Sequence, residues 1–306
     1  MKPDARVLLG ALALDLVAGE PPDRCHPVRW IGRVLDWADR RARSRTRARG
    51  AVVVVSIAAG AALLAAVVAT LARRAGHLGP ILEAVALKPA FSVRRLARAA
   101  AEVADALDAG RLAEARTLVG HHLVSRPTAA LGDSEVASAA VESVAENLAD
   151  SVAAPLLAYA LGGLPAAWAY RTLNTADAMW GYREPRYACF GMAAARLDDV
   201  ANLVPARLAA AALVAAAPFA GGNGRDAAHV AWRDHVRTAS PNAGWPMSAM
   251  AGALGVGLAK PGAYHLGDGP LPGAPTVIPR ALRLYGVASL LVVATAYAVA
   301  RWRTAR

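Results

Sequence analysis

Charged residues are missing from several long stretches of this chain and are concentrated between them. The clearest apolar segment, Ala51–Ala72 (AVVVVSIAAGAALLAAVVATLA), is long enough to cross a hydrocarbon core of about 30 Å as a helix. The other apolar segments are shorter, or contain charged residues, glycine or proline. Together the segments cover about 7–19, 51–72, 152–170, 203–222 and 285–300. The pattern predicts an all-α, polytopic integral membrane protein in which residues 1–306 form a single membrane-embedded helical domain.

Polar residues between the second and third apolar segments recur at helical spacing. Over Phe91–Ala109 the apolar side chains lie three and four positions apart, which is typical of an amphipathic helix. A second short helix is expected over Leu112–Val119, and a third from Asp133, where Asp133 and Ser134 are good N-cap residues. The sequence therefore predicts a polar helical region over 91–150, and loops over 171–202 and 223–250.

The third of these helices carries a row of carboxylates. Glu142, Glu146 and Asp150 recur at intervals of four, so they share one helical face, and they run directly into the third apolar segment. Like charges at this spacing destabilise an isolated helix by a few tenths of a kcal/mol per pair. A solvated acidic face would explain the row, but an unpaired carboxylate next to an apolar span is costly. Carboxylate oxygens also suit a divalent cation, so both interpretations stay open.

The densest polar segment covers residues 171–207. Asn174 and Asp177 share a helix face by their spacing, as do Asp198 and Asn202. Carboxylate and amide oxygens can hold Mg²⁺, and guanidinium groups bind phosphate through paired hydrogen bonds. The segment therefore predicts a site for a phosphorylated substrate, although each residue alone could equally cap a helix or form an ion pair, as Asp199 could with Arg196. Between the two pairs lies a basic, aromatic loop with Tyr182, Arg183, Arg186 and Tyr187.

The charge balance fits a membrane protein. Of 306 residues, 56% are hydrophobic and only 19% are charged, yet the net charge is +11. The run Asp39–Arg49 (DRRARSRTRAR) precedes the best apolar segment, as expected of a cytoplasmic loop that faces anionic lipid. This run lacks interleaved aromatic residues and a surrounding nucleic-acid module, so no nucleic-acid partner is expected.

Several common signatures are absent from the sequence. Cys25 and Cys189 are too few for a metal cluster or a disulfide framework, and the first residues lack the pattern of a cleavable signal. No GxxxxGK[ST], GxSxG or HExxH motif occurs. ATP, if it is used, is therefore bound without a phosphate loop of the GxxxxGK[ST] type.

Six long stretches follow one another in a fixed order: LALDLVAGEPP, HPVRWIGR, VESVAENLADSVAAPLL, NTADAMWGYREPRYACFG, ARLDDVANLVPARL and SPNAGWPMSAMAGALG. In sequence and in order they resemble the CobD/CbiB family, the adenosylcobinamide-phosphate synthases of cobalamin biosynthesis. The resemblance covers nearly the whole chain, from about Leu12 to Gly255. One departure is Arg126-Pro127, where the family tends to carry an Arg-Asp pair upstream of the acidic helix, so no role is assigned to that loop.

The resemblance implies a multi-pass enzyme of the cell membrane whose active site faces the cytoplasm. It implies an amide bond between the free propionate carboxylate of adenosylcobyric acid and the amine of (R)-1-amino-2-propanol or its O-phosphate. ATP and Mg²⁺ are the implied cofactors, because a carboxylate must be activated before it condenses with an amine. The expected partners are these two substrates and the lipid bilayer, and the sequence is also compatible with a homo-oligomer or with association with other corrin-pathway enzymes.

The family's reaction suggests roles for the polar residues. A base is needed because a protonated amine is not nucleophilic. The candidate catalytic residues are Glu142, Glu146, Asp150 and Asp177, and the candidate Mg²⁺ ligands are Glu146, Asp198 and Asp199. The candidate substrate-binding residues are Asn147, Asn174, Tyr182, Arg183, Arg186, Tyr187, Asn202, Arg207, Asn242 and His26. A histidine beside prolines, as in EPPDRCHPVRW, also suits a structural role.

Two other classes of protein stay open from the sequence alone. A Mg²⁺-dependent, prenyltransferase-like membrane enzyme would explain LDDVAN, but only one such acidic pair is present, where two aspartate-rich motifs are expected. A transporter would explain ionisable residues beside interrupted spans, but no inverted repeat is visible. The topology is open as well. If 152–170 crosses the bilayer fully, the acidic helix and Asn174–Asn202 lie on opposite sides, whereas its glycine and proline residues also permit a re-entrant path.

Overall fold

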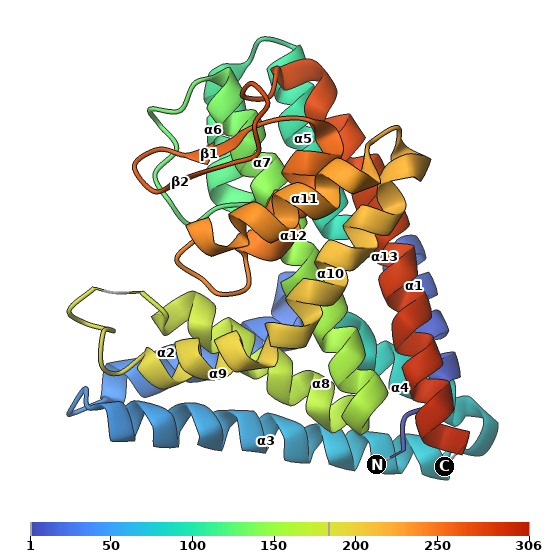
Figure 1. The fold of residues 1–306 in the computed structure, drawn as a ribbon. Helices are drawn as coiled ribbons and strands as arrows, with labels where there is room; N and C mark the ends of the chain where they lie inside the picture. Colours follow the sequence, from blue (N-terminus) through green and yellow to red (C-terminus); the bar gives the residue numbers. More distant parts are fainter. Residues whose placement is uncertain (1, 183, 306) are drawn as a thin grey trace. The chain divides into compact units, whose positions relative to one another are not determined.

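The computed structural model of the chain describes residues 2–182 and 184–305, except for the side chains of residues 274 and 275. Apart from one short hairpin, the regular structure of these residues is helical, which confirms the predicted all-α class. Figure 1 shows the order of the elements along the chain.

Four helices are long and apolar enough to cross a membrane: Arg47–Arg74, Asp133–Trp180, Leu203–Ala220 and Thr276–Ala305. They correspond to four of the five predicted apolar segments and confirm a polytopic membrane protein. The remaining segment, predicted at 7–19, forms a helix of 14 residues, Ala5–Ala18. That is shorter than the roughly 20 residues needed for a full crossing.

The chain packs into two compact units. Unit 1 contains Met1–Ser92, Ala154–Asn202 and Val293–Arg306, and unit 2 contains Val93–Ala153 and Leu203–Val292. The single membrane-embedded domain expected from the sequence stays a prediction.

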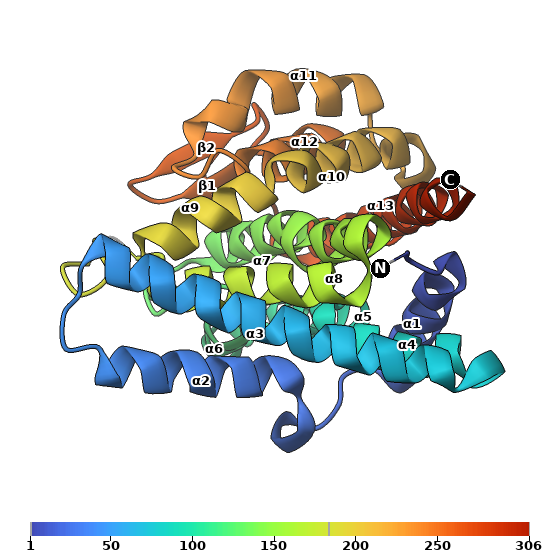
Figure 2. The same cartoon turned by 90° about the horizontal axis from the view of Figure 1, so that it is seen from below.

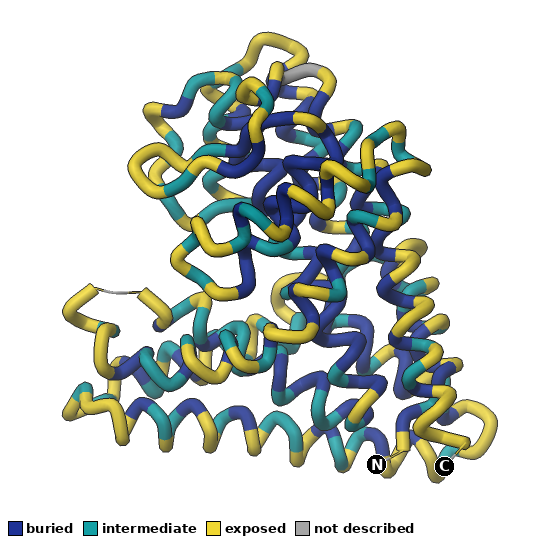
Figure 3. The backbone as a smooth tube through the Cα atoms, viewed as in Figure 1, coloured by how far each residue is buried: buried dark blue, intermediate teal, exposed yellow. Residues whose placement is uncertain are grey.

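Unit 1 is built from three separate parts of the chain. Its core joins four helices through Leu35, Val54, Trp180 and Ala194, and the ring of Phe190, which precedes the last of these helices, lies 5.1 Å from the ring of Trp180. Only 17% of the apolar window of Arg47–Arg74 is buried, and buried and exposed stretches alternate along this helix in Figure 3. The α-helices of unit 1 are α1 (Ala5–Ala18), α2 (Pro27–Arg41), α3 (Arg47–Arg74), α4 (Gly79–Leu87), α8 (Ala154–Trp180), α9 (Met192–Ala201) and the last part of α13 (Ala274–Ala305), with 3₁₀ turns at Asp23–Cys25, Gly76–Leu78 and Lys88–Ala90.

Unit 2 contains the predicted polar helical region and three further helices that run side by side in Figure 2, α10, α11 and α12. Helices α11 and α12 approach closely because Gly252 has no side chain: a Cβ there would lie 2.5 Å from the carbonyl oxygen of Asp226. The elements of unit 2 are α5 (Arg94–Asp108), α6 (Leu112–His122), α7 (Asp133–Asn147), α10 (Leu203–Ala216), α11 (Gly224–Asp234), α12 (Gly244–Leu254), β1 (Leu258–Lys260), β2 (Tyr264–Leu266) and the first part of α13, with 3₁₀ turns at Ala217–Ala220 and His235–Arg237.

A tight turn in unit 2 forms the hairpin, which the sequence analysis did not predict. Ala263 N donates a hydrogen bond to Lys260 O at 2.9 Å, and Gly262 has a φ of 72°. A type II turn requires a positive φ at its third position and often has proline at its second, and Gly262 and Pro261 meet both conditions. The register pairs Lys260 with Tyr264, so these two residues lie at the same level of the hairpin.

The acidic helix α7 does not end in a loop. It continues into a π-helical turn, Leu148–Ala153, after which α8 begins. The wider turn takes Asp150 out of the four-residue register that relates Glu142 to Glu146. Helix α8 then bends at Gly163, where φ is 71°, two residues before Pro165. Glycine and proline are the usual causes of such a bend.

The structure corrects the two predicted loops. In 171–202, residues up to Trp180 continue α8 and Met192–Ala201 form α9, and in 223–250 most residues belong to α11 and α12. The physical reason is that polar residues at three- and four-residue spacing leave an apolar face free to pack. In α8 that face includes Ala176 and Trp180, which are 0% and 1% exposed.

Candidate functional site

A buried carboxylate, Asp198, connects α8 with α9 in unit 1. Its Oδ1 accepts a hydrogen bond from Asn174 Nδ2 at 3.3 Å, and its Oδ2 accepts one from Asn202 Nδ2 at 3.0 Å. Tyr170 Oη donates to Asn202 Oδ1 at 3.0 Å, and Arg171 Nη1 donates to Asn174 Oδ1 at 3.1 Å. We call these five residues the α8–α9 cluster. It brings together three of the residues that the sequence analysis singled out.

The electrostatics of this cluster suit a cation. Burial raises the pKa of Asp198, the amide groups of Asn174 and Asn202 act against this, and the charge of Asp199 raises the pKa further. Burial also raises the pKa of Asp199, against the opposing charge of Arg196. Raised carboxyl pKa values mean that the surrounding protein leaves the negative charge under-compensated. Because the donors are oxygens, the cluster fits Mg²⁺ by the chemistry of its donor set.

The predicted basic loop is tied to α2. Arg186 Nη2 donates a hydrogen bond to Asp39 Oδ2 at 2.6 Å, Tyr187 Oη donates to the same oxygen at 3.4 Å, and Arg45 Nη1 donates to Asp39 Oδ1 at 2.7 Å. Burial opposes the ionisation of Asp39, but the two guanidinium groups outweigh it and lower the pKa of this carboxyl. Arg186 and Tyr187 therefore have a structural partner. Their role in binding substrate stays a prediction.

Two other predicted residues, Asp177 and Tyr182, lie at the end of α8 or just after it. Asp177 folds back over this end, since a Cβ on Gly181 would lie 2.1 Å from Asp177 Oδ1. Only glycine at position 181 leaves this carboxylate where it is. Tyr182 is 41% exposed, and Arg183 lies outside the described residues. The roles proposed for these three residues stay predictions.

An ion-pair network that the sequence analysis did not predict surrounds Lys88 in unit 1. Lys88 Nζ lies 2.9 Å from Asp15 Oδ1 and 2.8 Å from Glu20 Oε1, and Glu20 Oε2 lies 3.0 Å from His26 Nε2. The side chains of Lys88 and Asp15 are only 6% and 0% exposed. His26 Nδ1 accepts a hydrogen bond from Val28 N at 3.3 Å and so caps α2. Both ring nitrogens of His26 thus have protein partners, which supports its structural role, whereas substrate binding by His26 stays a prediction.

This network makes stability depend on pH. Burial opposes the ionisation of Glu20, but hydrogen bonds from His26 and Lys88 outweigh it and lower the pKa of Glu20 from 4.5 to about 2. A lowered carboxyl pKa contributes stability that is fully present above about pH 4.5 and is lost as the pH falls toward about 2. We expect the thermal midpoint of the wild type to fall more between pH 6 and pH 3 than that of Glu20→Gln, measured in detergent. Parallel curves for the two proteins would contradict this.

In unit 2 a second buried carboxylate, Glu142, connects α7 with the hairpin. Its Oε1 accepts a hydrogen bond from Ser138 Oγ at 2.7 Å, and its Oε2 accepts one from Tyr264 Oη at 2.7 Å. Arg126 Nη2 lies 3.6 Å from the same Oε2. Ala259 N donates to Ser138 Oγ at 2.9 Å, which fixes β1 to the same turn of α7. We call Arg126, Ser138, Glu142 and Tyr264 the α7–hairpin cluster. Glu142 is only 4% exposed, so a solvated acidic face is the wrong interpretation for this residue.

Charges of both signs act on this cluster. Burial raises the pKa of Tyr264, and the negative charges of Glu142 and Glu146 raise it further, against Arg126. Arg126 Nε and Nη1 are buried and have no hydrogen-bond partner among the described residues. Buried guanidinium N–H groups are normally paired, so these two groups are available for an anion.

The polar residues beyond Glu142 lie at the junction of α7 and the π-helical turn. Asn147 Nδ2 donates to Ser143 O at 3.0 Å, and Asn147 Oδ1 accepts a hydrogen bond from Ser151 Oγ at 2.8 Å. Glu146 and Asp150 are both half-buried. Asn147 therefore stabilises the turn, and the assigned roles of these three residues stay predictions. π-helical turns inside longer helices are frequently found at functional sites.

The structure also brings together the predicted residues Arg207 and Asn242 of unit 2. Arg207 Nη1 donates to Asn242 Oδ1 at 3.1 Å, and the Arg207 guanidinium carbon lies 5.0 Å from the centroid of the Trp245 ring. The ring of His235 stacks on Trp245 at 3.9 Å with an interplanar angle of 24°. Asn242 is 5% exposed, so its buried amide holds the guanidinium group of Arg207 in place. The ring of Trp232 lies edge-on to Trp245 at 6.0 Å, so Trp245 already has three partners from its own unit.

The predicted Mg²⁺ ligands are divided between the units, since Glu146 belongs to unit 2 and Asp198 and Asp199 belong to unit 1. Across the described ranges, no group of three or more His, Cys, Asp or Glu residues lies close enough to hold a metal ion. Mg²⁺ commonly needs only one or two carboxylates when the phosphates of a substrate supply further ligands. The Mg²⁺ site stays a prediction.

Sequence reasoning missed Tyr264 and Lys260 and assigned no role to Arg126. The signal for the hairpin was present, because Pro261-Gly262 is a strong turn dipeptide between two short segments. No sequence signal marks Arg126 as a neighbour of Glu142, because the contact spans 16 residues of irregular chain and helix. The network around Lys88 was missed because Asp15 and Lys88 are far apart in sequence.

Comparison with known proteins shows which family the chain belongs to. A family model described as "CobD/Cbib protein" matches residues 8–285. The chain belongs to the CobD/CbiB family. It is 40% identical to the probable cobalamin biosynthesis protein CobD of Methanothermobacter thermautotrophicus over 87% of each chain. Identity to the cobalamin biosynthesis protein CobD of Geobacter metallireducens is 41% over 95% of each chain, and identity to that of Klebsiella pneumoniae is 39% over 95% of this chain and 96% of the relative. No solved structure matches the chain.

Family membership confirms the resemblance found in the sequence and gives the protein a role in cobalamin biosynthesis. The match includes both acidic residues around which the two clusters form, Glu142 and Asp198. It argues against the prenyltransferase-like and transporter interpretations, because neither belongs to this family.

Proposed function

We propose that this membrane enzyme of cobalamin biosynthesis joins the free propionate carboxylate of adenosylcobyric acid to the amine of (R)-1-amino-2-propanol or its O-phosphate, forming an amide. Support for the pathway comes from the family, and support for the chemistry comes from the side chains. The observation that carries the proposal is the α7–hairpin cluster. In it the buried carboxylate of Glu142 lies beside the guanidinium group of Arg126, two of whose N–H groups have no hydrogen-bond partner among the described residues.

The charges of this cluster match the two ends of an aminoalkyl phosphate. Glu142, and Glu146 one turn further along α7, offer negative charge to an ammonium group. Arg126 Nε and Nη1 offer two N–H donors to a phosphate, and Lys260 adds positive charge close enough to act on Glu142. A carboxylate in this position can also take the proton that the ammonium must lose before nitrogen attacks. The phosphorylated amine is the better match, because the unphosphorylated amine would leave Arg126 Nε and Nη1 without an acceptor.

The carboxylate substrate needs a leaving group before the amine attacks. In the proposed reaction a propionate oxygen attacks the γ-phosphorus of ATP and ADP leaves. The amine nitrogen then attacks the acyl carbon, phosphate leaves, and a carboxylate of the enzyme takes the amine proton. Phosphoryl transfer depends mainly on positioning and on compensation of charge, which Mg²⁺ would supply when bound. We propose that Asp198 of the α8–α9 cluster contributes an oxygen ligand to a bound Mg²⁺, supported by its burial, its two amide partners and its raised pKa.

The direct test supplies membranes containing the protein with adenosylcobyric acid, ATP, Mg²⁺ and either amine, and follows the amide by mass spectrometry. We expect the amide to form, to require ATP, and to be accompanied by ADP. Membranes from the same host without the protein are the control. If neither amine yields an amide while the protein is inserted and folded, the proposed reaction is wrong.

Replacement of Arg126 distinguishes the two amines. We expect Arg126→Gln to raise the KM for the phosphorylated amine by about tenfold or more, since a lost charge-assisted hydrogen bond of about 1.4 kcal/mol corresponds to a factor of ten. The KM for the unphosphorylated amine should hardly change. Arg98→Gln is the control, because Arg98 is 72% exposed and forms an ion pair with Glu102 on α5. Equal effects on both amines would contradict an anion site at Arg126.

A further inference from the structure

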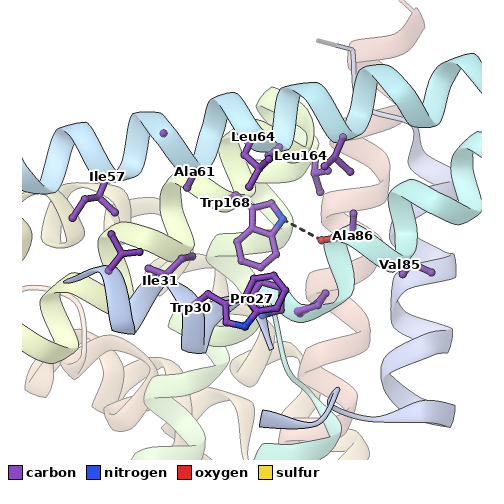
Figure 4. A pocket seen from close by; sticks show the side chains of 15 residues that line it. Pro27, Trp30, Ile31, Ile57, Ala61, Leu64, Val85, Ala86, Leu164 and Trp168 are labelled. Atoms are coloured by element: carbon purple, nitrogen blue, oxygen red, sulfur yellow. Dashed lines mark hydrogen bonds between the residues drawn. The ribbon is translucent and has the colours of Figure 1, made fainter. Parts of the chain in front are cut away.

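An apolar cavity of about 510 Å³ lies inside unit 1, between α2, α3, α4 and α8. Figure 4 shows side chains from these helices that line it, with Trp168 lying between Leu64 and Pro27. Its other lining residues include Trp30, Ile31 and Ala61. None of the side chains that line it carries a charge.

The polar atoms of the lining are already satisfied. Trp168 Nε1 donates to Ala86 O at 3.1 Å, a bond drawn in Figure 4, and Trp30 Nε1 donates to Arg24 O at 3.0 Å. No indole N–H group of the lining is therefore left for a ligand. A cavity of this chemistry offers water no hydrogen-bond partners, so an apolar occupant is favoured.

The position of the cavity along α3 selects the occupant. Its α3 lining runs from Ile57 to Val68, and α3 itself runs from Arg47 to Arg74, so the cavity lies close to the middle of this spanning helix. At 1.5 Å per residue the α3 wall is about 16 Å long, which fits within a hydrocarbon core of about 30 Å. At that depth the surrounding solvent consists of acyl chains.

The rim of the cavity opens to the outside of unit 1. Leu64 and Val85 line it and are 67% and 53% exposed, whereas Trp168 is 8% exposed and forms its recessed floor. Trp30, Val34 and Trp37 continue the exposed apolar surface along α2, at 50%, 47% and 56% exposure. An open, apolar recess beside a thinly covered spanning helix is continuous with the lipid around it.

We infer that this cavity holds an acyl chain of a membrane phospholipid, which fills the recess between α2 and α3 in the folded enzyme. This is a lipid-binding site in addition to the proposed reaction, and it does not depend on that reaction. The acyl chain supplies packing contacts that the side chains of α2, α3 and α8 do not supply. In an empty cavity the atoms of the walls would lack these dispersion contacts.

The test uses the full-length protein in nanodiscs of phosphatidylcholine that carries a diazirine in the middle of one acyl chain. After irradiation and digestion, peptide mapping by mass spectrometry locates the label. We expect label on the recessed Trp168 and on Ile31, in addition to the exposed residues of α3. Label confined to exposed residues such as Leu63 would show surrounding lipid only and would overturn the inference.

A filled cavity is the second arm of the test. Gly60 lines the cavity, and a Cβ there would meet nothing within 4 Å, so a side chain can begin at this position, and Gly60→Trp adds a large apolar ring at the cavity wall. We expect Gly60→Trp to reduce the label on Trp168 several-fold, while Ala59→Trp, at an exposed neighbouring position outside the lining, leaves it unchanged. Equal labelling in both variants would contradict the site. A photo-crosslink at Leu64 to a second copy of the chain would also contradict it, because the recess would then be covered by protein.

Discussion

Glu142→Gln is expected to lower the rate of amide formation by about 100-fold or more while the protein remains inserted in the membrane. The amide of glutamine keeps the size of the side chain but removes the charge that faces Arg126, and its NH₂ group would face the hydroxyl donors of Ser138 and Tyr264. A positioned general base contributes roughly 10² to 10⁴ to a rate. The measurement is the initial rate of amide formation by purified protein in nanodiscs.

The control for this variant is Glu102→Gln, which removes a carboxylate from an exposed pair on α5 of the same unit. It should retain the wild-type rate. Tyr264→Phe removes only one hydrogen bond to Glu142, so an intermediate loss of rate is expected. If Glu142→Gln is poorly folded, the rate of Tyr264→Phe tests the role of Glu142 instead. A wild-type rate in folded Glu142→Gln would remove Glu142 from the reaction.

Lys88→Met is expected to give the largest loss of stability. The ammonium of Lys88 lies within 2.9 Å of two carboxylates, and its removal leaves Asp15 and Glu20 buried without their shared counter-charge. Breaking a buried ion pair in this way costs about 3–5 kcal/mol. We expect the thermal midpoint in detergent to fall by about 5 °C or more, using the usual dependence of the midpoint on stability.

Two further variants separate charge from packing at this position. Lys2→Met replaces an exposed lysine of the same unit and should leave the midpoint unchanged. Combining Lys88→Met with Asp15→Asn and Glu20→Gln removes the unpaired charges and should restore much of the lost stability, since an apolar or neutral replacement of a whole buried pair is often tolerated. A triple variant no more stable than Lys88→Met would show that packing, and not charge, explains the loss.

The hydrophobic pattern predicted the spans well because a membrane imposes a simple requirement on sequence. A chain that crosses hydrocarbon needs about 20 apolar residues whose backbone is satisfied internally, and both conditions can be read locally. The segment 7–19 shows the limit of this reading. It was too short for a crossing, and the partner that the structure gives to Asp15 inside it, Lys88, lies more than 70 residues away in the sequence.

The polar segments were harder to predict. Their helices depend on packing that polar composition conceals, so 171–202 and 223–250 were expected as loops although α8, α9, α11 and α12 occupy most of them. For the candidate site, four-residue spacing correctly placed Asn202 beside Asp198, because that relation lies within one helix turn. The same spacing relates Ser138 to Glu142, but it could not reveal the other two partners of Glu142, Tyr264 and Arg126, which come from a hairpin and an irregular segment.

The sequence by itself determined that this is an all-α membrane protein of the CobD/CbiB family, since span length, charge bias and ordered motifs are properties of the chain read residue by residue. Only the tertiary structure decided which polar residues from distant parts of the chain are neighbours. It paired Glu142 with the hairpin, Asp198 with Asn174, and Lys88 with two carboxylates. Such contacts form where burial removes water and forces each charge to find a partner, and the identity of that partner depends on the fold rather than on its distance along the chain.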